Sequence, residues 1–425
     1  MVAVVAECIK SLTGISLGRS YAKCHHHSPP TTNFAGVKGM ILTDYFHSSY
    51  RDPSSERQIK QEANATAQKS LASVSFLNTP NCQKIAIITD KWSEKYSVYR
   101  TCFKQIATLK KRYHLTLITW RNRGYTPEMD IFHEIKMLNS PGALDLRSVR
   151  NSDFGLVYFP DIGMNYESVL LSNMRLAPIQ VTGIGHSVST FGSKIDYYIS
   201  GSDVENEDAQ QHYSEKLIRI PGFGCDFNKP NYTKHNKPHD TFVVNIAASK
   251  QKWNQKFLDT LTIIANSVNK KVLFQLFPGG GDLNLSWVPS NDSIKSSLKN
   301  IQIISECNYQ QYMEAMELGD ITLDSFHFGG CNSISDSLFL GIPPVALEGS
   351  RWYNRIGPAM LRRLRLSGLI CKTVVQYINT AITLINDNSL LLEMADKICH
   401  ADMDLIYNNG EEKRFTEAID MLIRN

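Results

Sequence analysis

From residue 84 onward, short apolar runs alternate with longer segments in which apolar residues recur every three or four positions. The runs predict strands and the longer segments predict helices. In the first half, the predicted strands are 84–89, 114–120, 154–159, 178–184 and 195–200, and the predicted helices are 98–113 and 166–174. Continuous apolar strands joined by helices are typical of a parallel sheet covered by helices on both faces.

A stretch at 222–240, rich in Asn, Pro and Lys, interrupts this alternation and is predicted to be a linker. The alternation then restarts, with predicted strands at 242–247, 272–277, 301–304, 321–326 and 342–347, and helices at 254–267, 309–317, 373–386 and 411–423. We therefore expect an α/β protein with two doubly wound halves. A ligand would bind at the carboxyl ends of the strands.

Residues 1–80 are mostly polar, and only 56–72 has a helical pattern. We predict four regions. They are an N-terminal extension, partly helical or disordered (1–80), an N-terminal Rossmann-like domain (81–225), a C-terminal Rossmann-like domain (240–400) and a C-terminal helix (401–425).

The composition is ordinary for a globular protein, with 425 residues, 42% hydrophobic residues and a net charge of +4. This weak charge argues against nucleic-acid binding. No apolar run reaches the ~18 residues of a membrane span. The nine cysteines are odd in number and never spaced Cys-x-x-Cys, which favours reduced thiols and a cytoplasmic location.

Two short motifs resemble metal sites, but we expect no metal at either. Cys24–His27 is best interpreted as a polar tail. Asp402-Met403-Asp404 falls in a late helical region at 391–407, and acids two apart on a helix do not share a face.

The most informative segment is 320–348, where a predicted strand leads into the glycine turn Phe328-Gly329-Gly330. A helix is predicted to begin near Cys331. Glycines let the backbone approach a ligand closely, and a helix start offers N–H groups and partial positive charge. This arrangement can hold a diphosphate without a metal, which points to a nucleotide-activated substrate.

Three polar residues lie where this fold would place a ligand, and each has a structural interpretation beside the functional one. Lys252 follows the strand 242–247 and could neutralise a leaving diphosphate or be a solvated lysine. Asp336, one turn into the glycine-led helix, could bind a ribose or be a surface acid favoured by the helix dipole. His186 follows the strand 178–184 and could act as a base, bind a phosphate or cap its loop.

Two segments, in order and spacing, resemble the family-41 glycosyltransferases. The first is 158–186, which contains Tyr-Phe-Pro-Asp-Ile-Gly-Met and ends in Gly-His. The second is 328–343, which reads Phe-Gly-Gly-Cys-Asn-Ser-Ile-Ser-Asp and ends in Leu-Gly-Ile-Pro. The resemblance covers about residues 84–395. It is closer to the bacterial enzymes that N-glucosylate high-molecular-weight adhesins than to the O-GlcNAc transferases.

The resemblance implies a GT-B fold and an inverting, metal-independent transfer from a UDP-sugar, without a cofactor. Lys252 matches the family's diphosphate-binding lysine, and Gly329 and Gly330 match its phosphate loop. Asn332 matches a donor-binding position. Asp336 matches a ribose-binding or structural aspartate.

Two further residues match positions of the family, while the loop after one of them differs in sequence. Gln275 falls where the family contacts the nucleotide, and His186 matches a histidine near the transferred sugar and acceptor, so that His186 and Lys252 are the predicted catalytic residues. The adhesin branch has Gly-His-Pro-Ala-Thr-Thr where this chain has Gly-His-Ser-Val-Ser-Thr. We expect no tetratricopeptide array before the matched region, and we expect the large all-helical domain of the adhesin enzymes to be missing or cut to about 80 residues.

We therefore expect a UDP-hexose donor, with glucose favoured, and a protein acceptor that is adhesin-like. Its asparagine is the favoured acceptor group, and Ser or Thr is the alternative. A second hypothesis is transfer to a glycan or a lipid-linked acceptor. A third is a catalytically inactive GT-B partner subunit, which would have no chemical need for Lys252, Asn332 and Asp336 together.

Overall fold

The fold is described from a computed structural model, which covers residues 44–71, 78–120, 127–138, 149, 152–235, 240–279, 285 and 287–424. These residues form two compact units. The N-terminal unit contains the described residues up to 229 together with 350–359 and 403–424. The C-terminal unit contains 230–349 and 360–402, within the described residues. Cys24–His27 and the glycines 280 and 281 lie outside the described part.

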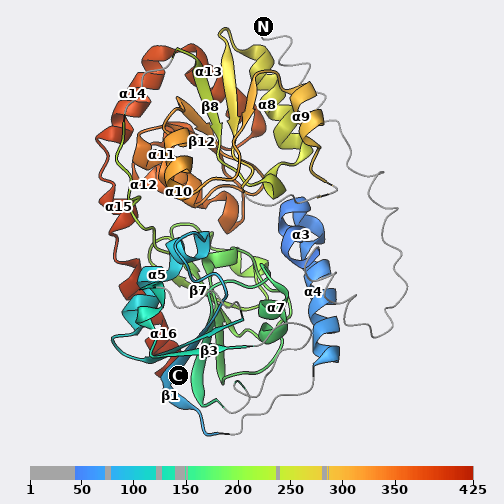
Figure 1. Cartoon of the computed structure of the whole chain (residues 1–425), viewed down its shortest axis with the longest axis vertical. Helices are drawn as coiled ribbons and strands as arrows, with labels where there is room; N and C mark the ends of the chain where they lie inside the picture. The colour runs from blue at the N-terminus through green and yellow to red at the C-terminus, as the bar shows by residue number, and fades with distance from the viewer. Residues whose placement is uncertain are drawn as a thin grey trace. The chain divides into compact units, whose positions relative to one another are not determined.

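The N-terminal unit is built on a seven-stranded parallel sheet of order β3-β2-β1-β4-β5-β6-β7 (Figure 1). The strands are β1 (Asn81–Ile88), β2 (His114–Thr119), β3 (Glu134–Met137), β4 (Phe154–Phe159), β5 (Ile179–Thr182), β6 (Tyr197–Gly201) and β7 (Lys216–Ile220). The main helices are α3 (Phe46–Arg51), α4 (Pro53–Ser70), α5 (Ser97–Leu109), α7 (Tyr166–Ser172) and α16 (Glu411–Arg424).

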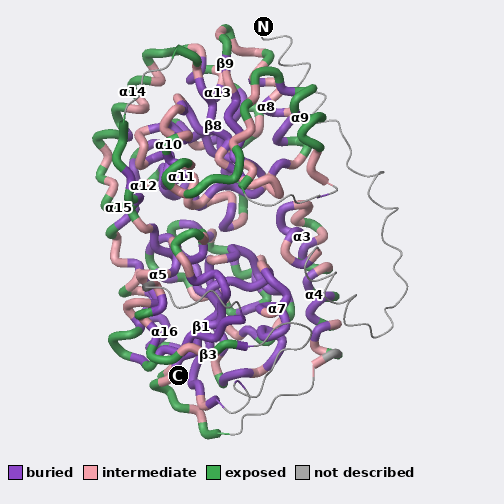
Figure 2. The backbone as a smooth tube through the Cα atoms, viewed as in Figure 1, coloured by how far each residue is buried: buried purple, intermediate pink, exposed green. Residues whose placement is uncertain are grey.

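Alternation along β1 divides the core of this unit between the two faces of the sheet. Ala86 and Ile88 join one buried cluster, which α4 and α7 complete. Ile85 and Ile87 join the other cluster, to which α5 and α16 contribute. Since successive strand residues point to opposite faces, helices from both ends of the chain cover one sheet. Figure 2 shows the resulting buried interior in purple.

Local signals fix where two of these helices begin. Asp52 caps α4 by accepting a 3.0 Å hydrogen bond from the Ser54 amide, and Pro53 occupies the first helical position. The Glu411 side chain, at the start of α16, accepts hydrogen bonds from the Phe223 and Gly224 amides. The buried Glu411 carboxylate therefore ties the end of the chain to the loop after β7.

The C-terminal unit is built on a six-stranded parallel sheet of order β10-β9-β8-β11-β12-β13. Its strands are β8 (Phe242–Ile246), β9 (Val272–Leu276), β10 (Ile301–Ile303), β11 (Ile321–Leu323), β12 (Pro344–Leu347) and β13 (Ile370–Cys371). Its helices are α8 (Gln255–Ser267), α9 (Asn291–Ser297), α10 (Tyr309–Met316), α11 (Asn332–Leu340), α13 (Val374–Asn386) and α14 (Asn388–Cys399), while α12 (Ile356–Arg363) crosses the boundary between the units.

The predicted α/β class with two parallel sheets is confirmed. The edge strands β3, β7 and β13 were not predicted, because they are short and only partly buried and so lack a continuous apolar run. The predicted strand 321–326 ends at Leu323, where the chain turns toward the glycines. The predicted helical region 391–407 contains two helices, since α14 ends at Cys399 and α15 (Asp404–Tyr407) begins separately.

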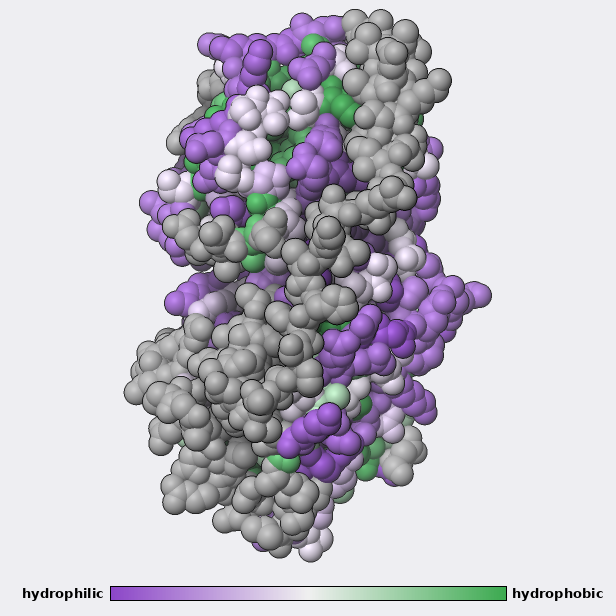
Figure 3. Space-filling model, turned by 90° about the vertical axis from the view of Figure 1, so that its right-hand side faces the viewer, coloured by the Kyte–Doolittle hydropathy of each residue, from purple (hydrophilic) through white to green (hydrophobic). Residues whose placement is uncertain are grey.

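The surface of the described residues carries little exposed apolar area. The large apolar side chains that are exposed are Met137, Val375, Leu392, Leu405 and Met421. On the face shown in Figure 3, hydrophilic residues predominate between small hydrophobic areas. Within the described part of the chain, every helix is too short or too polar to cross a membrane.

Candidate functional site

Two charged side chains, one aspartate and one lysine, form hydrogen bonds with the backbone of the glycine turn in the C-terminal unit. Asp324, the first residue after β11, is buried, and its Oδ1 accepts a 2.6 Å hydrogen bond from the Gly330 amide. Lys252 ends a short 3₁₀ turn after β8, and its Nζ donates a 2.7 Å hydrogen bond to the Gly329 carbonyl. The two neighbouring strands thus bring both charges to one turn at their carboxyl ends.

Position 330 accepts only glycine without rearrangement. A Cβ there would lie 2.3 Å from Ser333 Oγ and 3.0 Å from Asp324 Oδ1. The turn is braced further by Ser325, whose hydroxyl donates to the Phe328 carbonyl at 2.8 Å. The backbone is therefore close-packed at the point where α11 begins, as a phosphate-binding turn requires.

Burial disfavours the charged form of both Lys252 and Asp324. It lowers the pKa of Lys252, although Asp324 and Cys331 partly oppose the shift. It also raises the pKa of Asp324 to about 7, against the opposing effects of Lys252 and the Gly330 amide. Near neutral pH, Asp324 therefore changes its charge easily, and an anion bound above the turn would favour its protonated form.

The turn opens α11 as predicted, with Cys331 at the N-cap and no side-chain capping bond from it. Asn332 is the first helical residue. Asp336 lies one turn further and is 1% exposed, and its Oδ1 accepts a 2.8 Å hydrogen bond from the Tyr309 hydroxyl. The interpretation of Asp336 as a surface acid is therefore wrong. The structure brings Lys252, Gly329, Gly330 and Asn332 to one turn.

Gln275 is buried within β9 rather than at its carboxyl end. Its side-chain amide donates to the Ala315 carbonyl at 2.7 Å and to Asn245 Oδ1 at 3.3 Å. These contacts pack it between β8 and α10. Its predicted contact with the nucleotide stays a prediction, for which the side-chain oxygen is the remaining group.

His186 lies in the N-terminal unit, in a 3₁₀ turn after β5, and is 4% exposed. Its Nδ1 is 2.9 Å from the Ile162 carbonyl, and since a carbonyl only accepts, Nδ1 carries the proton. Nε2 faces Ser49 Oγ at 3.5 Å, and the ring packs against Phe46 and Tyr50 of α3. Burial, followed by the nearby Lys60, holds the pKa of His186 well below its usual value. A neutral imidazole under α3 favours the structural interpretation.

Helix α4 holds the loop that follows His186 by side-chain hydrogen bonds to three consecutive carbonyls. Lys60 Nζ donates to Ser189 at 3.0 Å, and the Asn64 amide donates to Thr190 at 2.7 Å and to Phe191 at 3.2 Å. From the other side, the Glu215 carboxylate accepts from the Ser189 hydroxyl at 2.7 Å and from the Thr190 amide at 2.9 Å. This loop, whose sequence departs from the adhesin branch, is thus clamped on two sides.

Among the described residues, no three His, Cys, Asp or Glu side chains come together as a set that could hold a metal ion. Asp402 lies in the break between α14 and α15, and Asp404 is the first residue of α15. Positive charge at the glycine turn comes from Lys252 and from backbone N–H groups.

Residues 230–413, which include the glycine turn, Lys252 and α11, match the model of glycosyl transferase family 41. This matched part of the chain belongs to glycosyltransferase family 41. A UDP-glucose:protein N-beta-glucosyltransferase of Actinobacillus pleuropneumoniae serotype 5b (strain L20) is 26% identical over 413 residues, covering 92% of this chain and 65% of the relative. Its counterpart from serotype 7 (strain AP76) is 30% identical over 298 residues, covering 68% of this chain and 46% of the relative. The chain thus spans 65% and 46% of the length of these two curated relatives.

Solved structures support the same fold. The Thermobaculum terrenum O-GlcNAc transferase matches with a TM-score of 0.75 at 16% identity, covering 91% of this chain and 76% of that chain. Anabaena HepE, solved with UDP and glucose, matches with a TM-score of 0.50 at 13% identity, covering 80% of this chain and 98% of that chain. At these identities the likeness shows the fold alone, which is the GT-B fold that the resemblance implies.

Sequence reasoning missed Asp324, Lys60 and Glu56. Asp324 could have been found, because it directly follows a buried strand and precedes the glycine turn. Lys60 and Glu56 carry no such signal. They lie one turn apart in a polar helix, where such a pair is typical of a solvated face, yet they are 1% and 2% exposed.

Proposed function

We propose that this protein transfers a hexose, with glucose favoured, from a UDP-sugar to a side chain of an acceptor protein, with asparagine as the favoured acceptor. Family membership and the names of the A. pleuropneumoniae relatives support the donor and the protein acceptor. The observation that carries the proposal is the position of Lys252 beside the Gly329-Gly330 turn.

In the proposed reaction, the bond between the anomeric carbon and the diphosphate oxygen breaks, and the acceptor nitrogen or oxygen bonds to the opposite face of that carbon. UDP leaves with the bonding electron pair, and the acceptor loses a proton to a base or to water. Negative charge grows on the diphosphate as the bond breaks. Preorganised donors at that position lower the barrier.

Lys252 suits this role because an ammonium group has three hydrogens, and one of them is used on Gly329. The remaining hydrogens, the backbone amides at the start of α11 and the helix dipole supply positive charge without a metal or a cofactor. We therefore propose metal-independent, inverting transfer. Asn332 and Asp336 would hold the sugar and the ribose of the donor, and Gln275 the nucleotide.

His186 enters the proposal as a group near the acceptor. Its neutral ring offers Nε2 as a hydrogen-bond acceptor, but α3 covers it in the structure. We therefore propose that His186 acts mainly by holding the loop 187–193 in its shape, a role that a His186 variant can distinguish from catalysis. A cytoplasmic location is also proposed, and it is supported by the described cysteines, which form no disulfide bond with one another.

The test measures UDP release by the purified protein in EDTA, with UDP-glucose, UDP-GlcNAc or UDP-galactose and a peptide that contains Asn-x-Thr. We expect release with one donor, a hexose mass shift on the peptide, and loss of both in Lys252→Ala. Lys250→Ala is the matched control, since Lys250 lies in the same 3₁₀ turn and Lys250 makes no side-chain hydrogen bond with the described residues. UDP binding without release from any donor would support an inactive partner subunit instead.

A further inference from the structure

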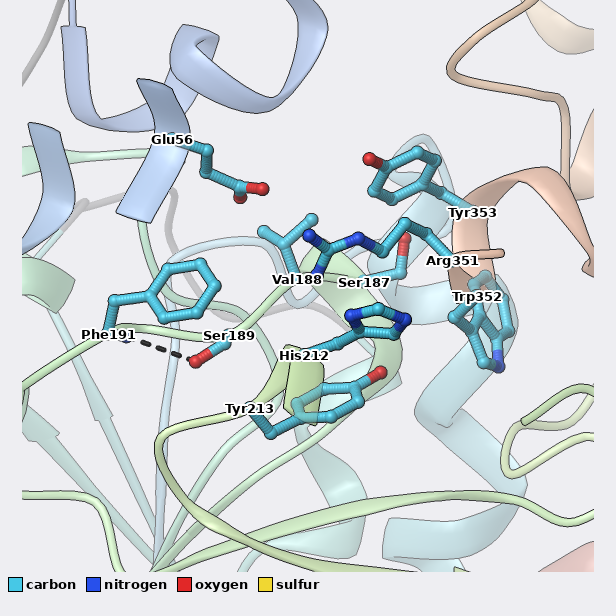
Figure 4. A pocket seen from close by; sticks show the side chains of 10 residues that line it. All are labelled: Glu56, Ser187, Val188, Ser189, Phe191, His212, Tyr213, Arg351, Trp352 and Tyr353. Carbon is cyan, nitrogen blue, oxygen red and sulfur yellow. Dashed lines mark hydrogen bonds between the residues drawn. The ribbon is translucent and has the colours of Figure 1, made fainter. Parts of the chain in front are cut away.

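A small hollow lies within the N-terminal unit, beside the clamped loop (Figure 4). The space between its lining side chains is narrow, and its empty volume is about 250 Å³ only when the open solvent at its mouth is counted. Four parts of the chain that are separate in sequence line it: Glu56 of α4, the segment Ser187–Ser189 with Phe191, the pair His212 and Tyr213, and Arg351–Tyr353. We call it the Glu56–Arg351 hollow.

Glu56 supplies a buried acceptor to this hollow. The side chain is 2% exposed, and Oε1 accepts a 2.9 Å hydrogen bond from Lys60. Oε2 accepts no hydrogen bond from any residue that the structure describes. Lys60 is itself fixed on the Ser189 carbonyl and offsets the charge of Glu56 from behind. A buried carboxylate oxygen that is held in this way is ready to accept a hydrogen bond from a ligand.

Arg351 supplies the donor. Its backbone amide is bonded to Asn354, but its guanidinium forms neither an ion pair nor a hydrogen bond within the described part of the chain. It also forms no ion pair with Glu56, although both side chains line the same hollow. Figure 4 shows the guanidinium lying between Val188 and Tyr353, and the Glu56 carboxylate directed to the same space.

The lining is neutral overall and offers opposite hydrogen-bonding roles. Its charged groups are one carboxylate and one guanidinium, while Tyr213 and Tyr353 stay protonated because burial raises the pKa of both. His212 is neutral near pH 7, since burial and then Arg351 lower its pKa. A second carboxylate in the hollow would be repelled by Glu56. An ammonium would be repelled by Arg351.

We propose that the Glu56–Arg351 hollow binds a side-chain carboxamide of the acceptor polypeptide, whose N–H donates to Glu56 Oε2 and whose carbonyl accepts from Arg351. The carboxamide is the neutral side-chain group that has both N–H donors and a carbonyl acceptor. This inference rests on the proposed function for the identity of the acceptor. The carboxamide can come from the acceptor asparagine or from a neighbouring Asn or Gln.

The experiment measures peptide binding by calorimetry with UDP present, so that no transfer occurs. One peptide contains a single Asn in an Asn-x-Thr context, and its counterparts contain Asp, Gln or Ser at that position. A fifth peptide has Ser at that position and Asn two residues away, which separates the two sources. The variants are Arg351→Gln and Glu56→Gln, with Arg414→Gln as the control, since Arg414 is partly exposed and donates a hydrogen bond to the Pro221 carbonyl outside the hollow.

We expect the wild-type protein to bind the Asn peptide at least about 10-fold more tightly than the Asp peptide, because hydrogen bonds to charged groups contribute that much. Arg351→Gln should weaken binding of the Asn peptide by about 10- to 100-fold. Glu56→Gln should improve binding of the Asp peptide, which a merely misfolded loop would not do. Arg414→Gln should change neither.

Wild-type protein that binds no peptide, or that binds the Asn and Asp peptides equally, would overturn the proposal. So would an unchanged preference in both variants. UDP affinity is measured separately with the same samples. If the wild-type protein does not bind UDP, the proposed function is refuted. If it binds UDP but shows no preference for the carboxamide peptide, only the proposed role of the hollow is refuted.

Discussion

Lys60 Nζ lies 2.9 Å from Glu56 Oε1 and 3.0 Å from the carbonyl oxygen of Ser189, and the side chains of Lys60 and Glu56 are both buried. One ammonium group thus neutralises a buried carboxylate and also fixes the loop 187–193, which is distant from it in the sequence. Burial lowers the pKa of Lys60, and Glu56 opposes that shift. In this buried site, the Lys60 ammonium is stabilised because the Glu56 carboxylate lies beside it.

Replacing Lys60 by methionine should therefore strongly destabilise the N-terminal unit. Removal of one partner of a buried ion pair costs about 3–5 kcal/mol, because the other charge stays buried alone. The measurement is the midpoint of thermal unfolding, followed by circular dichroism. The double variant Lys60→Met, Glu56→Gln should recover a large share of the loss. A Lys60→Met variant that melts at the wild-type temperature would show that the pair contributes little.

Gly330→Ala should abolish UDP binding with little effect on folding of the rest of the unit. The new Cβ would lie 2.3 Å from Ser333 Oγ and would displace the turn from Asp324. Gly368→Ala is the matched control, because a Cβ at position 368 of the same unit meets no atom within 4 Å. We expect a loss of UDP affinity of more than about 100-fold for the former, given several donors displaced, and none for the latter. Equal affinities would place the diphosphate elsewhere.

UDP affinity should rise as the pH falls from 8 to 6. The pKa of Asp324 is raised to about 7 by burial, so below this value the carboxyl is neutral and the turn keeps the positive charge of Lys252. Bound diphosphate favours the neutral carboxyl, so binding takes up a proton. In Asp324→Asn this part of the pH dependence should disappear, which removes the contribution of UDP's own titration from the comparison. The same slope in both proteins would contradict the assignment.

The sequence was sufficient for the buried strands of the two sheets and for the glycine turn, because both depend on local signals. Apolar runs mark the buried strands. The glycines, Cys331 and Gly341 mark the limits of α11, which ends with Gly341 in the left-handed conformation at φ 84°. Lys252 could be placed at the same edge, because the carboxyl ends of β8 and β11 are neighbours in one parallel sheet.

The features that could not be predicted from the sequence depend on contacts between distant parts of the chain. Nothing in the pattern of 411–423 says which sheet the helix covers, yet Phe415 and Ile419 of α16 join the core of the N-terminal unit. The Glu56–Arg351 hollow unites residues that lie far apart in the sequence. Lys60 and Glu56 look like a solvated helix pair until the loop 187–193 covers them.

His186 should behave as a neutral, structural residue. Its pKa is held well below the usual value, so the folded protein resists protonation that the unfolded chain accepts, and its contribution to stability is lost as the pH falls below about 6.5. The thermal midpoint of the wild-type protein should therefore fall more steeply between pH 7 and pH 5 than that of His186→Asn. The turnover number of His186→Asn, with saturating peptide at a temperature where it is folded, should stay within about 10-fold of wild type, since general base catalysis contributes about 10²–10⁴-fold. A drop of that larger size, with an unchanged melting profile, would instead make His186 the base.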